Sequence, residues 1–600
     1  MTTFSAHFLP KLPKIVQEDV RFSIARRKKR GNPTRENIER FTNEAVKHAL
    51  KWSPVIENKF SFVDARSNSV DTPHHHSAIR SSIRLSHEVL MSDDAVKHLA
   101  TNLTERFTRE MGLIGLDEDN TRSYFDALKY AFLKMSEIME TVYIKPPKVK
   151  NKHECIVKAE RELERAIRRC LDIDYLVRKF KFLRSQYIEH SQIALDRVGE
   201  DKGQREYISS RSFARWEKKQ KDGEQFIQSM SVVSEETGES FKLSDVVERT
   251  TANPKNRRIE LVVRSRGDEE RAIDLGYVGV FITWTLASKY HRKSKKWNGC
   301  TVKEGHQNIM EQWKLARAWF KKLDIDWFGL RVAEPHKDGT AHAHLFLYVH
   351  PSQREQLIKV CADIARNEDS DELLTPEIEE KRFLAKEGDP SKGTATGYII
   401  KYICKNIDGE HLPESDANIN AQSARAWAST HRIKQFSQSG SPAVGLWRQL
   451  RRASKLDTAF DEELEKLRDN ADNSRWKGFC ELGFKAKLAY EEKFNKYGDT
   501  VKRVIGIDWL GKVIETCREH FSLVKTKDVK RRALDSKEAD ASPWSTENKC
   551  NQHLIEALTR VTGWSERGVQ CLISPLKKGA KVPIDKFMTL ALRNGRLIQT

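Results

Sequence analysis

The segment that most restricts the fold of this chain reads Ala-His-Ala-His-Leu from residue 341. Successive side chains of a β-strand point to opposite faces of the sheet. A strand over 341–349 therefore places His342 and His344 on one face and turns its small and aliphatic side chains toward a core. Residues 327–334 also have the composition of a strand, and the turn over 335–340 contains Asp-Gly. We therefore expect an antiparallel hairpin.

This hairpin brings a third polar side chain to the two imidazoles. Glu334 ends the first strand, so the returning chain places it beside His342 and His344. One carboxylate and two imidazoles that leave coordination positions open are what a catalytic divalent metal needs. His336 and Asp338, in the turn, are alternative third ligands. Without such neighbours, two alternating histidines are more often a satisfied pair in a core.

A second motif has the spacing of a helix. Tyr398 and Tyr402 are four residues apart, so a helix presents their hydroxyls on one face, with Lys405 further along. A tyrosine pair at this spacing is more often packing than chemistry. Next to a metal-binding hairpin, however, two phenols suit nucleophilic attack on phosphorus. Because a phenol has a pKa near about 10, Lys405 is placed to favour the phenolate or to hold the phosphate.

The motifs, in this order, resemble those of the HUH endonuclease superfamily, in which U is a hydrophobic residue, here Ala343. Within that superfamily the chain resembles the replication gene A proteins of P-two-type temperate tailed phages. The similarity extends over residues 150 to 455 and is densest from 257 to 452. Its segments are 281–285 with 288–291, 334–340 with the two histidines, 398–405, 424–428, 432–436 and 445–452.

The resemblance implies an α+β fold, in which an HUH endonuclease domain has an antiparallel sheet flanked by helices. It also implies a rolling-circle replication initiator that nicks one strand of origin DNA. Tyr398 or Tyr402 would attack, leaving a 5′-phosphotyrosine and a free 3′-hydroxyl, and the other tyrosine would cut and rejoin the strand later. Mg²⁺ or Mn²⁺ would be held by Glu334, His342 and His344. The sequence does not fix which tyrosine attacks first.

The expected partners are single-stranded or supercoiled origin DNA, a host helicase and a host polymerase. A host helicase is expected because Gly-x-x-x-x-Gly-Lys-Ser/Thr, the phosphate-binding loop of many ATP-driven motors, does not occur in the sequence. The net charge of +20, from 106 Lys and Arg against 86 Asp and Glu, favours encounter with DNA phosphates.

Other functions share part of these features. A conjugative relaxase or an HUH transposase would have the same chemistry but not the downstream segments. His336-x-Asp338 with a later histidine resembles the facial triad of non-haem iron oxygenases, which would leave the tyrosines unexplained. A non-enzymatic basic DNA-binding protein would need no alternating histidines.

The sequence predicts three regions: a mostly helical 1–255 with DNA or partner contacts, the nuclease domain at 256–410, and a mostly helical 411–600. In the first we expect long charged helices over 154–197. The predicted elements of the second are strands at 259–264 and 276–287, a helix at 307–322 burying Ile309, Trp313, Ala316 and Phe320, a helix at 352–366 and a charged connection at 367–393.

Several other segments have compositions that suggest a function. The basic tract 26–30 could touch DNA but is more often an exposed segment. His74 to His76 are expected in a solvated loop rather than at a metal. Linkers are expected at 411–420 and 533–548. Ser565 could cap the second helix of a helix-turn-helix, although a plain helical hairpin is the simpler interpretation.

The expected location is the cytoplasm of a bacterial host, with a phage or prophage as the source of the gene. The nine cysteines are scattered singly without a Cys-x-x-Cys pair, which argues against disulfides and zinc knuckles. The longest apolar stretch, 276–287, is too short to span a bilayer. No membrane partner and no secretory signal are therefore expected.

Overall fold

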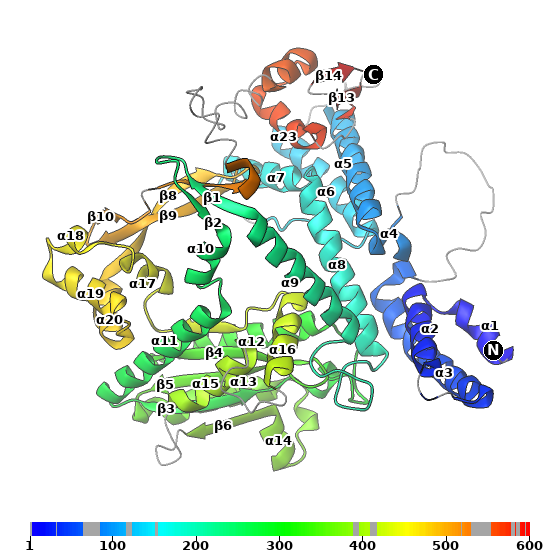
Figure 1. Cartoon of the computed structure of the whole chain (residues 1–600), viewed down its shortest axis with the longest axis horizontal. Coiled ribbons are helices and arrows are strands. Elements are labelled where there is room, and N and C mark those ends of the chain that lie inside the picture. The colour runs from blue at the N-terminus through cyan, green and yellow to red at the C-terminus, as the bar shows by residue number, and fades with distance from the viewer. Residues whose placement is uncertain are drawn as a thin grey trace. The chain divides into compact units, whose positions relative to one another are not determined.

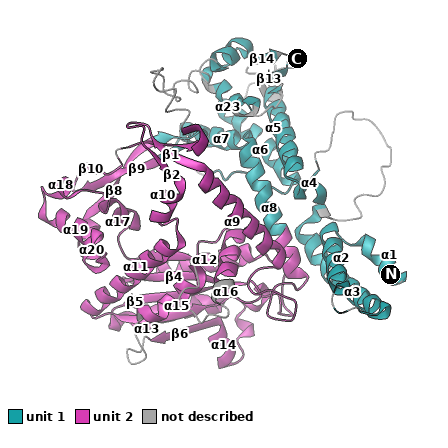
Figure 2. Cartoon of the chain, in the orientation of Figure 1, with its two compact units in different colours: residues 1–187, 493–501, 536–600 teal, residues 188–492, 502–535 magenta. Residues whose placement is uncertain are grey.

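The structure is a computed structural model that places the chain in two compact units (Figure 2). Unit 1 consists of residues 1–187, 493–501 and 536–600, and unit 2 of residues 188–492 and 502–535. The residues described are 3–29, 31, 33–63, 84–115, 123–150, 154–387, 395–407, 417–517, 519–529, 554–577, 582–583, 589–593 and 596–599. Among them, no helix combines the length and the apolar character needed to cross a membrane.

Unit 1 is mainly helical (Figure 1). Its elements are α1 (Thr3–Phe8), α2 (Lys14–Lys28), α3 (Arg35–Lys59), α4 (His87–Met91), α5 (Asp93–Gly115), α6 (Tyr124–Thr141), α7 (Ile156–Cys170), most of α8 (Ile173–Ala194), a helix over 554–562, α23 (Glu566–Lys577), β12 (Val582–Pro583), β13 (Thr589–Arg593) and β14 (Arg596–Gln599). The backbone N–H of Gly568 donates to Ser565 Oγ at 3.3 Å, so Ser565 caps α23 as predicted. A DNA-binding role for this helix pair stays a prediction.

Unit 2 combines helices with antiparallel strands. Its elements are α9 (Ser210–Ser229), β1 (Met230–Ser234), β2 (Ser240–Lys242), α10 (Leu243–Arg249), α11 (Pro254–Asp274), β3 (Val278–Trp284), α12 (Val302–Lys322), β4 (Trp327–Pro335), β5 (Ala341–Val349), α13 (Arg354–Asn367), α14 (Pro376–Arg382), β6 (Phe383–Glu387), α15 (Ala395–Ile407), α16 (Ala417–His431), β7 (Phe436–Ser439), α17 (Val444–Leu450), α18 (Lys455–Thr458), α19 (Glu462–Asp472), α20 (Trp476–Leu482), β8 (Ala486–Phe494), β9 (Thr500–Trp509), β10 (Lys512–Glu515) and β11 (Phe521–Lys525). This mixture is consistent with the predicted α+β class.

A five-stranded antiparallel sheet of order β6-β3-β5-β4-β7 forms the centre of unit 2 (Figure 1). The predicted hairpin is confirmed, since β4 and β5 pair along their whole length with Glu334 opposite His342. The turn between them is closed by the N–H of His336, which donates to the carbonyl of Thr340 at 2.7 Å.

The side chains of β5 point alternately into two apolar layers, one on each face of the sheet. Leu345 and Leu347 pack with α12 and α13, in a cluster that contains Trp313, Phe320 and Leu357. The predicted inward residues of α12 are all buried there. On the other face, Phe346 joins a cluster with α11, α15 and β7, whose buried members include Leu261, Ile399, Ile403 and Phe436. His342 and His344 share the face of Phe346 because they differ from it by even steps.

The prediction of a strand over 259–264 is wrong, because these residues lie inside α11. Asn253 caps that helix by accepting from the N–H of Lys255 at 3.0 Å, and Pro254 occupies its first turn. Five of the six buried residues of α11 recur every three or four positions: Arg258, Leu261, Ser265, Asp268 and Ala272. The apolar run Leu261 to Val263 resembled a strand because it is too short to distinguish the two periods.

The long helices predicted over 154–197 are confirmed as α7 and α8. Asp172 separates them, and its side chain accepts from the N–H of Asp174 at 3.2 Å where α8 begins. One other prediction of helix is corrected. The region 411–600 is not mostly helical, since it contains β7 to β14. Strand β8 was missed because most of its residues are exposed, so it lacks the apolar alternation that identifies a half-buried strand.

The charged connection over 367–393 also contains structure. Its residues 376–382 form α14, and the following strand β6 pairs with β3 at the edge of the central sheet. An edge strand needs only one pairing partner, so its sequence can remain polar. His74 to His76, Arg30, most of the linker at 411–420 and the linker at 533–548 lie outside the described residues.

We expect Gly329→Ala to disrupt the hairpin. Gly329 has a φ of +155°, and a Cβ there would lie 1.9 Å from the carbonyl oxygen of Phe346 in β5. Alanine would force the two strands apart, so we expect the free energy of unfolding to fall by about 3 kcal/mol or more. Urea unfolding followed by tryptophan fluorescence measures this loss.

Gly276→Ala is the matched control. Gly276 has a φ of +65°, but no described heavy atom lies within 4 Å of its added Cβ. Its cost should be limited to about 1–2 kcal/mol for the left-handed backbone. Equal losses in the two variants would show that the close approach of β4 and β5 is not what requires glycine.

Candidate active site

The end of the β4–β5 hairpin holds three potential metal ligands. His342 Nε2 lies 3.0 Å from His344 Nε2, and the latter lies 3.7 Å from Glu334 Oε2. One ligand atom from each residue falls within 4.8 Å of the others, and all three side chains are buried. The structure thus brings together the three ligands predicted from the sequence.

The protonation of the two imidazoles fits a cation. Burial lowers the pKa of His342, and burial with the charge of Lys405 lowers the pKa of His344 to about 3. Both rings are therefore neutral at pH 7, and neutral imidazole nitrogens are metal ligands. Thr283 Oγ1 lies 3.2 Å from His344 Nδ1 and orients that ring so that Nε2 faces the cluster. This donor set fits a divalent metal.

Glu334 is held by two neighbouring residues of α15. Lys405 Nζ donates to Oε2 at 3.2 Å, and the side-chain amide of Asn406 donates to Oε1. Burial raises the pKa of Glu334, while the Lys405 charge and these hydrogen bonds act in the opposite direction. Gln435 Nε2 donates to Asn406 Oδ1 at 2.9 Å, which fixes the amide with its nitrogen toward Glu334.

The two predicted nucleophiles lie on α15 beside this cluster. Their hydroxyl oxygens are 3.1 Å apart, and the Tyr402 ring centroid is 4.4 Å from that of His344. Tyr398 is 44% exposed, whereas Tyr402 is half-buried. Burial and the hydrogen bond with Tyr398 raise the pKa of Tyr402, so its phenol is protonated at neutral pH. The more exposed Tyr398 hydroxyl thus lies within hydrogen-bonding distance of the second phenol.

Lys405 contacts the carboxylate rather than a tyrosine hydroxyl. Besides its ion pair with Glu334, its Nζ lies 5.6 Å from the centroid of the Tyr207 ring. Burial alone would lower the pKa of Lys405, but the charge of Glu334 raises it above the usual value. Lys405 therefore stays cationic and supplies a fixed positive charge at the edge of the site.

The two alternative ligands in the turn have other contacts. The His336 ring lies tilted against His342 with centroids 4.0 Å apart, and Asp338 Oδ2 lies 3.5 Å from His291 Nδ1. Burial would raise the pKa of Asp338, but His291 and the N–H of Thr340 hold it at about 2. Neither residue joins the group of converging ligand atoms. The geometry favours Glu334 as the third ligand and does not favour an iron triad built on His336 and Asp338.

Sequence reasoning missed three residues of this site. Asn406 follows Lys405 directly, and its side chain also donates to the carbonyl of Tyr402 at 2.8 Å. Gln435 lies in the segment 432–436, which the family resemblance had already singled out. Tyr207 precedes α9 and carried no signal in the sequence. A search for polar residues next to each motif could have found the first two.

Comparison with known proteins gives a consistent set of matches. The family model described as bacteriophage replication gene A protein (GPA) matches residues 94–410. A probable replication protein of Pseudoalteromonas phage PM2 is 36% identical over 412 residues, which are 65% of this chain and 62% of that protein. The replication gene A protein of Escherichia phage 186 is 30% identical over 493 residues, 77% of this chain and 70% of that protein.

A third relative is named for an activity. The probable replication endonuclease from a prophage-like region of Salmonella typhimurium is 28% identical over 425 residues, which are 64% of this chain and 52% of that protein. The matched part of the chain thus spans between about half and 70% of these three relatives. No solved structure matches the chain significantly.

We expect His342→Ala and His344→Ala each to abolish Mn²⁺ binding, measured by titration calorimetry of the full chain. Each change removes one of three converging ligands, and the two that remain are too few for a stable site. His350→Ala is the matched control, because His350 directly follows the same strand but is exposed. Unchanged Mn²⁺ affinity in both site variants would contradict the assignment of these ligands.

Proposed function

Because the chain belongs to the bacteriophage replication gene A protein family, we propose that it initiates rolling-circle DNA replication as an HUH-type endonuclease. It nicks one strand of origin DNA by tyrosine transesterification. The observation that carries this proposal is the contact of the tyrosine pair with the ligand cluster, since Tyr402 lies against His344. The name of the Salmonella relative, a probable replication endonuclease, supports the same activity.

The proposed nick is an exchange of one phosphodiester for another. The tyrosine oxygen forms a bond to the scissile phosphorus, and the bond from phosphorus to the 3′ oxygen of the neighbouring sugar breaks. The phenol gives up its proton and the leaving 3′ oxygen gains one, so the products are a 5′-phosphotyrosine and a 3′-hydroxyl. A divalent cation held by Glu334, His342 and His344 would supply charge stabilisation at the phosphate.

The chain's own groups prepare this exchange. Thr283 orients His344, while Lys405 and Asn406 hold the carboxylate of Glu334 on the same side of the sheet as the tyrosines. The positive charge of Lys405 also favours the approach of an anionic phosphate. Because water is not the nucleophile, the energy of the ester is retained in the covalent adduct and the strand can be rejoined.

Two tyrosines allow two successive exchanges. In the proposed cycle, one tyrosine holds the parental 5′ end while a host polymerase extends the 3′ end. The other cuts the regenerated origin, and reversal of the first exchange closes the circle. The 3.1 Å separation of the two hydroxyls supports this sharing of one site. The alternative of a relaxase or a transposase would use the same chemistry, and the family match favours phage replication.

We place the nuclease activity in residues 256–410 and propose that 1–255 and 411–600 make contacts to DNA and to partners. The proposed location is the cytoplasm of a bacterial host that carries the phage or prophage. The substrate is single-stranded or supercoiled origin DNA, because the tyrosine must reach a backbone phosphate between unpaired bases.

We expect Tyr398→Phe/Tyr402→Phe to form no covalent adduct with DNA, because neither residue then has a nucleophilic oxygen. Each single variant should still nick but fail to complete circles. A single-stranded origin oligonucleotide labelled at its 3′ end reports the adduct as a band that survives denaturing electrophoresis. Tyr490→Phe, a tyrosine 46% exposed on β8, is the matched control and should behave like the unchanged chain. An adduct formed by the double variant would refute the assignment.

We also expect the purified chain to depend on a separate helicase. With ATP but no helicase, it should cut supercoiled or single-stranded origin DNA and leave relaxed duplex DNA wound, because its sequence lacks a phosphate-binding loop motif. Strand displacement on relaxed duplex origin, followed on a native gel, is the measurement. Processive unwinding under these conditions would show that the chain contains a motor.

A further inference from the structure

A concave surface in unit 1 lies between α7 and residues 493–501. Two cavities of about 340 and 270 Å³ open there, and Arg165 lines both of them. The arginines that line these cavities from α7 are Arg161, Arg165, Arg168 and Arg169. Their spacing places them along one side of the helix. We call this region the α7 surface.

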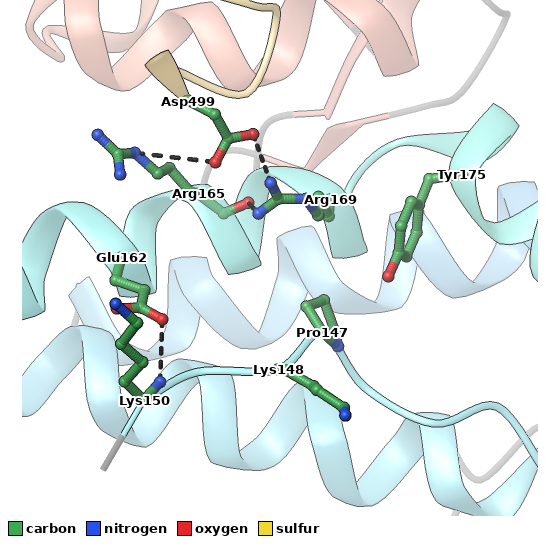
Figure 3. A pocket seen from close by; sticks show the side chains of 8 residues that line it. All are labelled: Pro147, Lys148, Lys150, Glu162, Arg165, Arg169, Tyr175 and Asp499. Carbon is green, nitrogen blue, oxygen red and sulfur yellow. Dashed lines mark hydrogen bonds and ion pairs between the residues drawn. The ribbon is translucent and has the colours of Figure 1, made fainter. Parts of the chain in front are cut away.

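The first cavity of the α7 surface combines cations with an aromatic ring (Figure 3). Figure 3 shows Arg165 and Arg169 on α7 turned toward Asp499, with Lys148 and Lys150 on a segment across the cavity and Tyr175 at one end. The four cationic side chains outnumber the two carboxylates, which are Glu162 and Asp499. Glu162 accepts from the backbone N–H of Lys150 at 2.9 Å, and Asp499 pairs with Arg169. The cavity therefore has a net positive charge.

The second cavity repeats this combination. Arg161, Arg165 and Arg168 line it together with Glu164, and Phe494 and Tyr497 supply aromatic rings. The Phe494 side chain is 77% exposed although it sits at the rim of a cationic cavity. Cations and aromatic rings thus line both cavities, and Arg165 is common to the two.

The segment 493–501, which carries Tyr497, is held in place by residues of the same unit. Arg165 Nε donates to the carbonyl of Gly498 at 2.9 Å, and Lys496 Nζ pairs with Asp172 at 2.6 Å. The Tyr497 hydroxyl donates to the same carboxylate of Asp172. Residues 493–501 are therefore fixed against the α7–α8 corner, and the surface needs little rearrangement to receive a ligand.

We propose that the α7 surface binds single-stranded DNA, with phosphates between the lysine segment and the α7 arginines and with bases stacked on Phe494 and Tyr175. A duplex hides its base faces by stacking and could use only the cations, whereas an unpaired strand uses both kinds of side chain. The proposal rests on the proposed function for DNA as the ligand. It adds a second DNA contact, in a different compact unit from the tyrosines.

The test uses the full chain with Tyr398→Phe/Tyr402→Phe, so that no adduct forms, and a fluorescent thirty-nucleotide oligo(dT). Fluorescence anisotropy should show that Phe494→Ala weakens binding by about 5- to 150-fold, the range for one lost base stack. Lys148→Ala/Lys150→Ala should make the dependence of log affinity on log salt less steep by about 1.4, for two lost phosphate contacts.

Two exposed residues of unit 1 provide matched controls. Phe22, 68% exposed on α2, and Lys97, exposed on α5, should each be replaceable by Ala with less than about a twofold change. The proposal is overturned if Phe494→Ala weakens binding no more than Phe22→Ala does. It is also overturned if dTMP displaces the oligonucleotide at equal nucleotide concentration, which would indicate a mononucleotide site.

The result is independent of the chemistry proposed for the tyrosines. If the double tyrosine variant still forms adducts, the proposed nucleophiles are wrong, whereas the effect of Phe494→Ala on binding stands. If adducts vanish but Phe494→Ala binds oligo(dT) normally, the proposed function stands and the α7 surface does not bind the strand.

Discussion

The arrangement of β4 and α15 at the candidate site depends on the buried carboxylate of Glu334. Its side chain is buried, and an isolated charge in such a place would be unstable by several kcal/mol. Lys405 and Asn406 satisfy it from α15, so the strand that carries the ligand and the helix that carries the tyrosines are tied at one point. Removing either partner would leave a buried charge uncompensated and would loosen the helix as well as the ligand.

Strand β5 serves the core and the site at the same time. Its histidines lie on the face toward α15, while Leu345 and Leu347 lie in the layer formed with α12 and α13. A slip of the pairing by one residue would exchange the two faces, burying leucines in the site and imidazoles in the core. The register is therefore protected by both layers, although β5 is buried along its whole length.

The parts that the sequence predicted well are those set by local patterns. The hairpin was predicted to within one residue at each end, because alternation and an Asp-Gly turn act over a few positions. The run at 259–264 was mistaken for a strand because the signals of a helix lie outside it. The capping residue Asn253 precedes the run, and the spacing of three to four residues between buried positions is visible only over the whole of α11. The contact between Gln435 and Asn406 joins residues from separate elements, so it depends on the tertiary fold and no local pattern contains it.

The division of the chain into two units has a consequence for biosynthesis. The chain passes from one unit to the other at 187/188, 492/493, 501/502 and 535/536. A ribosome therefore releases most of unit 1 long before residues 493–501 and 536–600 complete it. At typical bacterial elongation rates, residues 1–187 wait roughly 15 to 60 s for residues 493–501 to be made. During translation, unit 2 can therefore finish most of its own packing before residues 536–600 complete unit 1.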